Sequence, residues 1–367
     1  MKWTFKSKAI KSKAIKSKAI KSKGWLLSLA LAAVMLISPL AYHGGGRAEA
    51  APAFAKGADI SWIAGMEAQG YKWKDKNGTT RDILSILKTD YGLNSVRIRV
   101  WVNPNMSDYG NGYMNADKAA ALAVRAKAQG MSVMLTLHYS DSWADPGQQT
   151  KPAAWKSYTF QQLMDAVWSH TVSVMNTMKA QGVTPDWVQI GNETNNGMLW
   201  EDGKASVSMK NYAWLVNTGN NAVKSVFPSA KTIVHIANGY DNALFVWNIG
   251  GLISNGATFD AIGMSLYPTA TDWQAKVDQT IANANDMISR YGKSVIISEI
   301  GLDYNQPAAA KSFIADIKTK ARNIAGGKGL GVFYWEPEAT PGYNSGYNKG
   351  AWQADGKPTV ALEGFLN

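Results

Sequence analysis

Two glutamates at the ends of apolar runs are the residues in this sequence best suited to acid–base chemistry. Glu193 ends the run WVQIGNE and lies between the side-chain amides of Asn192 and Asn195. Glu299 lies near the end of a second run, SVIISEI. Two carboxyl groups that face each other can cleave a glycosidic bond when one is held protonated and the other stays ionised.

Each glutamate also has a simpler interpretation. A single glutamate at a strand end is commonly a surface ion pair or a helix cap. In addition, Asn192-Glu193-Thr194 fits the Asn-x-Thr glycosylation sequon. A glycan on Asn192 would fill the cleft in which Glu193 has to work, so the two interpretations exclude each other. The presence of a second glutamate favours catalysis, while Thr194 has no explanation from the sequence.

The run SVRIRVW at residues 95–101 predicts a strand with arginines on one face. Val96, Ile98 and Val100 alternate with Arg97 and Arg99, so the two sets point to opposite sides. If helices cover the aliphatic face, the arginines point into the interior. A buried guanidinium group needs an anion close by. We therefore expect acidic side chains in the same interior.

Aromatic residues close four of the predicted strands. They are Trp101, Tyr139, Tyr267 and Trp335. Such residues are ordinarily core, but a ring of them around two carboxylates would form a platform for sugar rings. The loop His138–Trp155 adds polar candidates in His138 and Asp141.

The remaining acids and histidines give no diagnostic metal motif. Outside the first 50 residues the histidines are His138, His170 and His235, and none belongs to an HExxH pattern. We predict no metal and no cofactor. Glu336 follows Trp335 and so has the opposite parity, which predicts that its side chain leaves the interior.

The elements that must position these residues alternate between strand and helix. Apolar runs of strand length lie at Gly57–Ser61, Ser95–Trp101, Ser132–Tyr139, Trp187–Glu193, Thr232–Asn238, Ala261–Tyr267, Ser294–Ile300 and Gly331–Glu336. Segments with helical spacing, such as 80–91 and 115–129, separate them. Eight such units predict an α/β fold, a (β/α)8 TIM barrel in a single domain. The longest non-helical connections, Ser140–Tyr158 and Pro337–Lys357, would lie at its C-terminal face, where active sites of this fold are built.

The first 50 residues have the pattern of a secretory signal peptide. A lysine-rich KSKAI repeat precedes an apolar stretch at 25–42, and AEAAP at 48–52 resembles a cleavage site. The apolar stretch is just long enough for an uncleaved membrane anchor, but Pro39 and the small residues favour cleavage. We predict a signal peptide at 1–50 and a secreted catalytic domain at 51–367.

Charge and cysteine content exclude several classes of function. Nine lysines and Arg47 against Glu49 give the first 50 residues +9 of the formal net charge of +11, which leaves +2 for the rest. Such a balance indicates neither a nucleic-acid partner nor stable membrane association after cleavage. The absence of cysteine excludes disulfides, thiolate metal sites and cysteine nucleophiles.

Several long motifs resemble one enzyme family. KGADIS at Lys56, VRIRVWVNP at Val96, LHYSDSWADPGQQTKPAAW at Leu137, VQIGNETNNGMLW at Val188 and SEIG at Ser298 are similar to the endo-β-1,4-galactanases of glycoside hydrolase family 53. The resemblance covers the chain from about Lys56 onward. It implies a retaining barrel hydrolase that cuts internal bonds of β-1,4-galactan, the neutral side chain of pectin.

The resemblance also assigns roles to individual residues. Glu193 would be the acid/base and Glu299 the nucleophile, with Asn192 on the sugar 2-hydroxyl. Arg99 and Tyr267 would hold the nucleophile. His138, Asp141 and Trp335 would line the central subsites. We expect a monomer whose partner is a neutral polysaccharide. Two alternatives are a related barrel hydrolase of β-mannan or β-glucan, and a non-catalytic carbohydrate-binding barrel.

Overall fold

Eight parallel strands close into a barrel in the computed structural model, which describes residues 54–366. Around the barrel the strands follow the order β1-β10-β9-β8-β7-β6-β5-β4, and every pair is parallel. Their bounds are β1 Ala55–Asp59, β4 Ser95–Val100, β5 Ser132–Leu137, β6 Trp187–Ile190, β7 Lys231–Ile236, β8 Ala261–Leu266, β9 Ser294–Ile300 and β10 Gly329–Tyr334. Two short strands, β2 Trp73–Lys74 and β3 Thr80–Arg81, form a separate antiparallel pair. The predicted barrel is confirmed.

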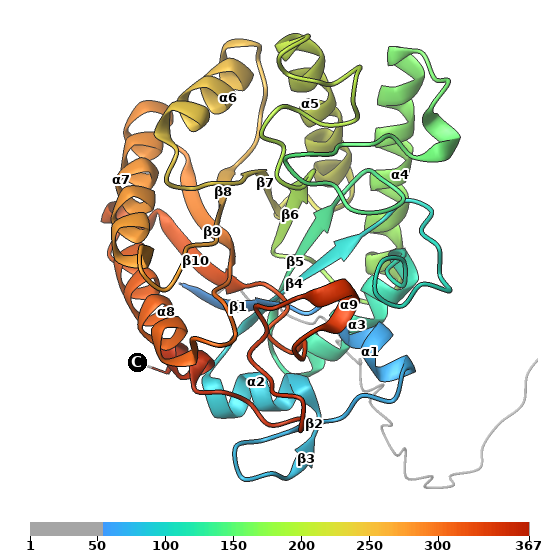
Figure 1. Ribbon diagram of the computed structural model, residues 1–367. Coiled ribbons are helices and arrows are strands. Elements are labelled where there is room, and N and C mark those ends of the chain that lie inside the picture. The colour runs from blue at the N-terminus through green and yellow to red at the C-terminus, as the bar shows by residue number, and fades with distance from the viewer. Residues whose placement is uncertain (1–53, 367) are drawn as a thin grey trace, which may run out of the picture. The chain divides into compact units, whose positions relative to one another are not determined.

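Helices alternate with the strands and surround them (Figure 1). Their bounds are α1 Ile63–Ala68, α2 Ile83–Tyr91, α3 Ala116–Ala128, α4 Phe160–Ala180, α5 Met209–Val226, α6 Asn242–Ser254, α7 Trp273–Tyr291, α8 Pro307–Arg322 and α9 Tyr343–Gly346. Three 3-10 helices are η1 Ala153–Trp155, η2 Ala325–Gly327 and η3 Ala361–Phe365.

Local sequence explains where these helices begin and end. The Asp82 side chain accepts the backbone N–H of Ser85 at the start of α2, and Gly92 ends that helix with φ +67°. At the start of α4, Thr159 and Gln162 form a reciprocal capping box. The helix predicted at 80–91 begins only at Ile83, because residues 80 and 81 form β3 and pair with β2.

The short helix η3 takes the place of an eighth long helix. It packs against α8, where the Lys318 ammonium group donates to the carbonyl oxygen of Gly364. Lys56 on β1 donates to the carbonyl oxygen of Phe365. A Cβ atom on Gly364 would lie 2.5 Å from the carbonyl oxygen of Lys311, so only glycine allows this close approach. The seam between β1 and β10 is thus covered by five residues.

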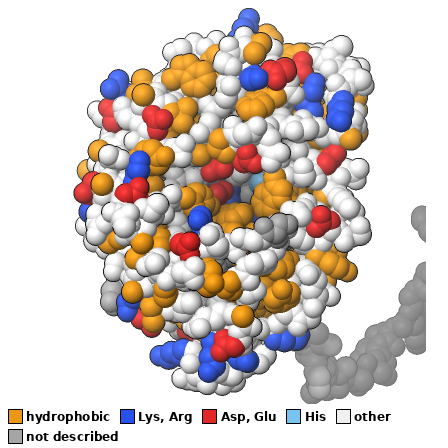
Figure 2. Space-filling model, in the orientation of Figure 1, with side chains coloured by type: hydrophobic (Ala, Val, Ile, Leu, Met, Phe, Trp, Pro, Cys, Tyr) orange, Lys and Arg blue, Asp and Glu red, His pale blue; other side chains and the backbone are white. Residues whose placement is uncertain are grey.

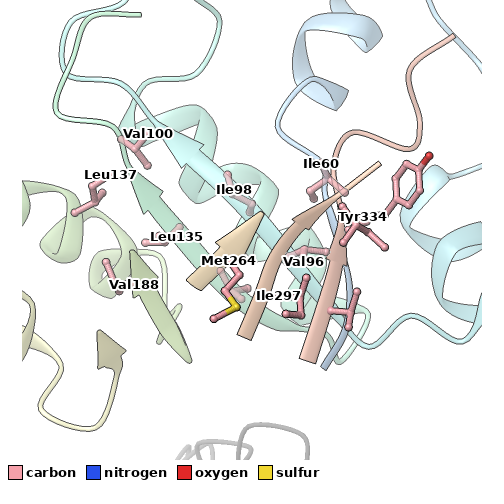
Figure 3. Packing of buried hydrophobic residues seen from close by; sticks show 14 of the residues in the cluster. Ile60, Val96, Ile98, Val100, Leu135, Leu137, Val188, Met264, Ile297 and Tyr334 are labelled. Carbon is pink, nitrogen blue, oxygen red and sulfur yellow. The ribbon is translucent and has the colours of Figure 1, made fainter. Parts of the chain in front are cut away.

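Aliphatic residues of the strands face the helices. Val96, Ile98 and Val100 belong to the large buried cluster between strands and helices, part of which Figure 3 shows. A smaller cluster fills the lower interior of the barrel: Ala55, Met134, Trp187, Ile233, Ala261, Ile296 and Phe333. Above it, Arg97 and Arg99 point inward as predicted. The charged part of the barrel interior therefore packs against an apolar part.

Several strands end earlier than their apolar runs predict. The run to Glu193 leaves the sheet at Ile190, and the run to Tyr139 leaves it at Leu137. The reason is backbone conformation, since Tyr139 has φ +51°, Glu193 has φ +44° and Gly191 has φ +84°. The backbone therefore leaves the extended conformation of a strand at these positions.

The two longest connections contain little regular structure, as predicted. The segment after β5 holds only η1, and the segment after β10 holds only α9 before η3. The described residues all lie within one compact unit, Ala48–Asn367. The predicted signal peptide at 1–50 lies outside the described residues. Within residues 54–366, no helix has the length and apolarity needed to cross a membrane.

Candidate active site

A cavity of about 320 Å³ opens at the C-terminal ends of the strands. Figure 2 looks into this hollow and shows acidic side chains at its centre among hydrophobic ones. The side chains and backbone that line it are Asp59, Arg97, Arg99, His138, Trp143, Ala144, Asp145, Asn192, Glu193, Tyr267, Glu299, Trp335, Tyr347 and Lys349. The loops after β5 and β10 both contribute, which agrees with their predicted place at this face.

Glu193 and Glu299 line the same cavity although 105 positions separate them in the chain. Strict alternation along β9 would place Glu299 outside, because Ile296 faces the interior. A shift of register resolves this, since Met264 pairs with Ile297 but the next residue, Ser265, pairs with Glu299. The extra residue, Ser298, is a β-bulge that turns Glu299 into the cavity.

Arg97 is the charged centre beneath the two glutamates. Its guanidinium group lies 2.6 Å from Asp59 and 2.7 Å from Glu299, and its side chain is 1% exposed. It also donates to Oε1 of Gln189 at 2.6 Å and to Oδ1 of Asn192 at 2.7 Å. The buried cation is therefore paired and hydrogen-bonded on every side, as its burial requires.

Arg99 does not hold Glu299, which corrects the role that the family resemblance implied. Its guanidinium group pairs with Glu336, while Arg97 takes the place beside Glu299. Three tryptophans surround the Arg99 guanidinium carbon, with ring centroids 5.4, 5.1 and 4.5 Å away: Trp62, Trp101 and Trp143. Arg99 is thus enclosed by aromatic rings that favour a cation.

Glu336 does not leave the interior, so the parity prediction is wrong. Its side chain is fully buried, accepts the backbone N–H of Trp62 at 3.0 Å and pairs with Arg99. The cause is again backbone conformation, because Glu336 lies beyond the end of β10 and has φ +45°. Burial, opposed by Arg99, raises the pKa of Glu336 to about 7.

The two catalytic candidates have different electrostatic settings. Burial and the neighbouring carboxylate of Glu299 raise the pKa of Glu193 to about 8. Burial raises the pKa of Glu299 as well, but the Arg97 ion pair and the Tyr267 hydroxyl, which donates to Oε2 at 2.9 Å, oppose the rise. Glu193 therefore keeps a proton at neutral pH, while Glu299 has the partners of an ionised carboxylate.

Asn192 and His235 connect these groups. The Asn192 amide nitrogen donates to the carbonyl oxygen of Ala144 at 2.8 Å, which leaves its oxygen for Arg97. His235 lies on β7 beneath Glu193 and is fully buried. Its inward parity follows from Ile233, which lies in the interior cluster. Alternation along β7 could thus have identified His235 from the sequence.

Not all of the predicted aromatic and polar residues line the cavity. His138, Tyr267 and Trp335 do, together with Trp143 and Tyr347, which the sequence analysis missed. Trp101 is buried against Arg99 and donates to Nδ1 of His138 at 3.3 Å. The Tyr139 hydroxyl is 2.7 Å from Oγ1 of Thr171 on α4, because Tyr139 has the same parity as Leu135 and Leu137, which face the helices.

Two further predicted residues support the loops around the cavity without lining it. Asp141 accepts the backbone N–H groups of Asn103 at 3.0 Å and Ala153 at 2.8 Å. Asn195 accepts the backbone N–H of Ala237 at 2.7 Å. Both side chains therefore fix the backbone on which cavity residues stand.

Thr194, which the sequence left unexplained, ties the end of β6 to its neighbours. Its hydroxyl is 2.6 Å from the Tyr212 hydroxyl, and its backbone N–H donates to the carbonyl oxygen of His235 at 2.8 Å. Its methyl group would lie 2.6 Å from a Cβ atom on Gly191. An apolar residue could not make the hydroxyl contact, so Thr194 anchors the backbone conformation of Glu193.

The described residues contain no group of three or more histidine or acidic side chains placed to hold a metal ion. In the cavity, Arg97 and the Tyr267 hydroxyl bind Glu299, and the Ser265 hydroxyl binds Glu193. The arrangement can supply one proton donor and one anionic nucleophile on a surface lined with aromatic rings.

Comparison with known proteins points to a single family. Residues 55–359 match glycosyl hydrolase family 53. A probable arabinogalactan endo-beta-1,4-galactanase A of Neosartorya fischeri is 36% identical over 307 residues, which covers 77% of this chain and 83% of that protein. An arabinogalactan endo-beta-1,4-galactanase of Humicola insolens is 35% identical over 303 residues, with 77% and 89% covered.

Solved structures give the same result. The Ignisphaera aggregans GH53 catalytic domain has a TM-score of 0.78 at 31% identity, covering 86% of this chain and 96% of that one. A structure of fungal beta-1,4-galactanases has a TM-score of 0.77 at 29% identity, with 85% and 98% covered. The match to the catalytic core of xylanase A, at 14% identity and a TM-score of 0.57, reflects the fold alone. With its barrel, its paired glutamates and these relatives, the chain belongs to glycosyl hydrolase family 53.

Proposed function

We propose that the protein is a retaining endo-β-1,4-galactanase that hydrolyses internal bonds of galactan by double displacement. The observation that carries the proposal is the pair Glu193 and Glu299, which share one cavity but differ in their partners. The relatives named arabinogalactan endo-beta-1,4-galactanase support the choice of substrate. Aromatic rings at Trp335 and Tyr347 offer apolar faces to a neutral sugar chain.

In the first step Glu193 donates its proton to the glycosidic oxygen while a carboxylate oxygen of Glu299 attacks the anomeric carbon. The bond to the leaving chain breaks, that chain departs with a new hydroxyl group, and a galactosyl ester forms on Glu299. In the second step Glu193, now ionised, takes a proton from water as the water oxygen attacks the same carbon. The ester breaks, Glu299 is regenerated, and the anomeric configuration is retained.

Cavity residues supply the remaining requirements of this cycle. Arg97 and Tyr267 hold Glu299 ionised and oriented before attack. Asn192 and His138 offer polar groups to the sugar hydroxyls. Arg99 also lines the cavity, where Glu336 pairs with its guanidinium group and the Trp143 ring lies against it. The retaining reaction needs carboxyl groups about 5–5.5 Å apart, so we predict this separation between Glu193 and Glu299.

The test of the proposal is product analysis on linear β-1,4-galactan. We expect galacto-oligosaccharides of mixed length, and proton NMR at early times should show the β-anomer first. Glu193→Ala and Glu299→Ala should each lower kcat by at least about 100-fold. Cleavage of β-mannan or β-glucan in place of galactan would overturn the substrate. Binding of galactan without hydrolysis would overturn the assignment as an enzyme of galactan.

The proposal includes the place in which the enzyme works. The lysine-rich and apolar segments within residues 1–50 have the order of a secretory signal peptide. We therefore propose that residues 51–367 act outside the cell as a monomer, without stable membrane association. Size-exclusion chromatography of the secreted protein tests the monomer, since a dimer would elute at twice the mass.

A further inference from the structure

A buried serine connects the acid–base glutamate to a histidine on the neighbouring strand. The Ser265 hydroxyl, at the end of β8, donates to Oε1 of Glu193 at 2.6 Å. Nε2 of His235, on β7, lies 2.7 Å from the same serine oxygen. Ser265 is 1% exposed and His235 is fully buried. Residues on β7, on β8 and after β6 thus form one continuous hydrogen-bond chain that ends on Glu193.

The direction of this chain follows from counting protons. Ser265 has one hydroxyl proton, and it is donated to Glu193. Nε2 of His235 must therefore carry a proton and donate to the serine oxygen. The other ring nitrogen, Nδ1, is then free to accept the backbone N–H of Glu193 at 3.4 Å. Burial and Arg97 lower the pKa of His235 well below 6.5, so the ring is neutral and carries a single proton.

The opposite tautomer would disconnect the chain. A proton on Nδ1 would be donated to Oδ1 of Asn192, which lies 3.1 Å away. Nε2 would then accept the Ser265 proton, and ionised Glu193 would lose its donor. The Asn192 amide cannot rotate to present its nitrogen to His235, because that nitrogen is bound to Ala144 and the amide oxygen to Arg97. The tautomer of His235 therefore decides whether Oε1 of Glu193 has a hydrogen-bond donor.

The second carboxylate oxygen, Oε2, receives no hydrogen bond from the described residues, and Glu193 lines the cavity. We propose that Ser265, held by His235, is a positioning residue for the acid–base glutamate: it keeps Oε1 as an acceptor and leaves Oε2 to carry the catalytic proton. The inference rests on the proposed function, because it assigns the acid–base role to Glu193. The same contact serves both steps, since Oε2 gives the proton in the first and takes one in the second.

Other charged and titratable groups face Glu193 from the surrounding elements. They are Arg97 on β4, His138 and Asp145 after β5, Tyr267 after β8 and Glu299 on β9. Glu299 and Asp145 raise the pKa of Glu193, whereas Arg97 and the Ser265 hydrogen bond lower it. Removing the serine hydroxyl leaves the other groups in place, so its own contribution can be measured.

The experiment compares Ser265→Ala with the parent enzyme on aryl β-1,4-galactobiosides. An unactivated phenol leaving group needs a proton from Glu193, whereas 2,4-dinitrophenolate leaves without one. We expect kcat/KM to fall about 10- to 100-fold with the phenyl substrate, a part of what general acid catalysis provides, and less than about 3-fold with the dinitrophenyl substrate. The alkaline limb of the kcat/KM profile should move up by about one pH unit, because the ionised carboxylate loses a donor.

Two variants control for structure. Thr136→Val removes a hydroxyl that is buried on β5, a strand that does not adjoin β8, and that is bonded to no partner among the described residues, so both rates should stay unchanged. Ser265→Thr keeps the hydroxyl and should recover most of the loss. An equal loss on both substrates with an unmoved alkaline limb would show that Ser265 is only structural and would overturn the proposal.

Two further measurements keep the inference separate from the proposed function. Glu193→Ala should also lose far more on the phenyl than on the dinitrophenyl substrate; if it does not, the role of Glu193 fails whatever Ser265 does. Nitrogen-15 NMR of the parent protein reports the His235 tautomer without any substitution. A proton on Nε2 supports the chain, and a proton on Nδ1 contradicts it.

Discussion

The carboxyl group of Glu338 is fully buried, and neither of its oxygens receives a hydrogen bond from an N–H or O–H group in residues 54–366. Its neighbour is the carboxyl group of Glu336, which is itself bound to Arg99. Burial and this second acid raise the pKa of Glu338 well above 4.5. Glu338 therefore stays protonated at neutral pH and can donate its proton to Glu336.

This acid makes the fold less stable in alkali. In the unfolded chain Glu338 ionises near its ordinary pKa of 4.5, whereas the folded chain holds the proton, so stability falls as pH rises above that value. The slope is up to about 1.4 kcal/mol per pH unit. Glu338→Gln should match the parent near pH 4 and exceed it in melting temperature increasingly toward pH 9, as measured by calorimetry.

The matched control is Glu201→Gln, because the Glu201 side chain is 68% exposed and pairs only with Lys204. That substitution should leave the pH dependence of the melting temperature unchanged. A constant difference between Glu338→Gln and the parent at every pH would contradict the protonated state of Glu338.

Arg97 and Arg99 are expected to differ in their effect on Glu299. Only Arg97 contacts Glu299, at 2.7 Å, whereas Arg99 contacts Glu336. Arg97→Lys cannot keep every bond of the planar group, so the pKa of Glu299 should rise and the acid limb of kcat/KM should move to higher pH. Arg99→Lys should lower the rate without moving that limb. Equal movement of the limb in both variants would restore the role that the resemblance gave to Arg99.

For individual residues, the sequence predicted the direction of a side chain wherever the two-residue alternation of a strand holds. The inward arginines and the need for interior acids followed from the parity of β4, and Asp59, Glu299 and Glu336 meet that need. Parity failed just past the end of β10, at Glu336, because a positive φ angle reverses the side-chain direction there. Such angles depend on the surrounding loops and have no signal in the residue types.

At the level of elements, the bulge in β9 decides which residue reaches the cavity. The sequence analysis chose Glu299 because it lies near the end of an apolar run, and the structure brings it into the cavity through this bulge. Alternation counted from Ile296 would point Ser298 inward and Glu299 outward. The extra residue in the register turns Glu299 inward. The sequence SVIISEI contains no glycine or proline that would predict such a bulge.

Packing of β1 against the apolar part of the barrel interior depends on a glycine. A Cβ atom on Gly57 would lie 2.2 Å from the Phe333 ring, which belongs to the interior cluster. Gly57→Ala should therefore destabilise the fold by about 1–3 kcal/mol, the usual cost of overpacking a core. Thermal unfolding measures the loss. Combining it with Phe333→Leu should recover part of the stability, and no recovery would mean that the strain lies elsewhere.

For the whole molecule, the order of strands and helices was predictable because eight apolar runs alternate with helical segments. The replacement of the last helix by η3 was not, since ALEGF has no helical period to read. The paired glutamates could be found because they end apolar runs, whereas Ser265 and His235 could not be connected. Their contact exists only once β7 and β8 lie side by side.

Export gives a prediction at the same scale. If residues 1–50 act as a signal peptide, the secreted protein should begin at Ala51, which N-terminal sequencing would reveal. Replacing Ala48 and Ala50 by bulky residues should block this cleavage, because the peptidase accepts only small side chains there. Secretion of a chain that still carries the lysine repeat would contradict the prediction.

The seam between β1 and β10 has a consequence for the timing of folding. Ala55 pairs with Gly331, so the first strand cannot find its partner until almost the entire barrel has been translated. At ~5–20 residues per second, the ribosome needs on the order of 15–60 s to make the intervening chain. During that interval β1 can pair only with β4, and the barrel stays open. A chain that must cross a membrane before it folds has to stay unfolded until then. Late closure of the barrel helps to keep it unfolded, because β1 meets β10 only at the end of synthesis.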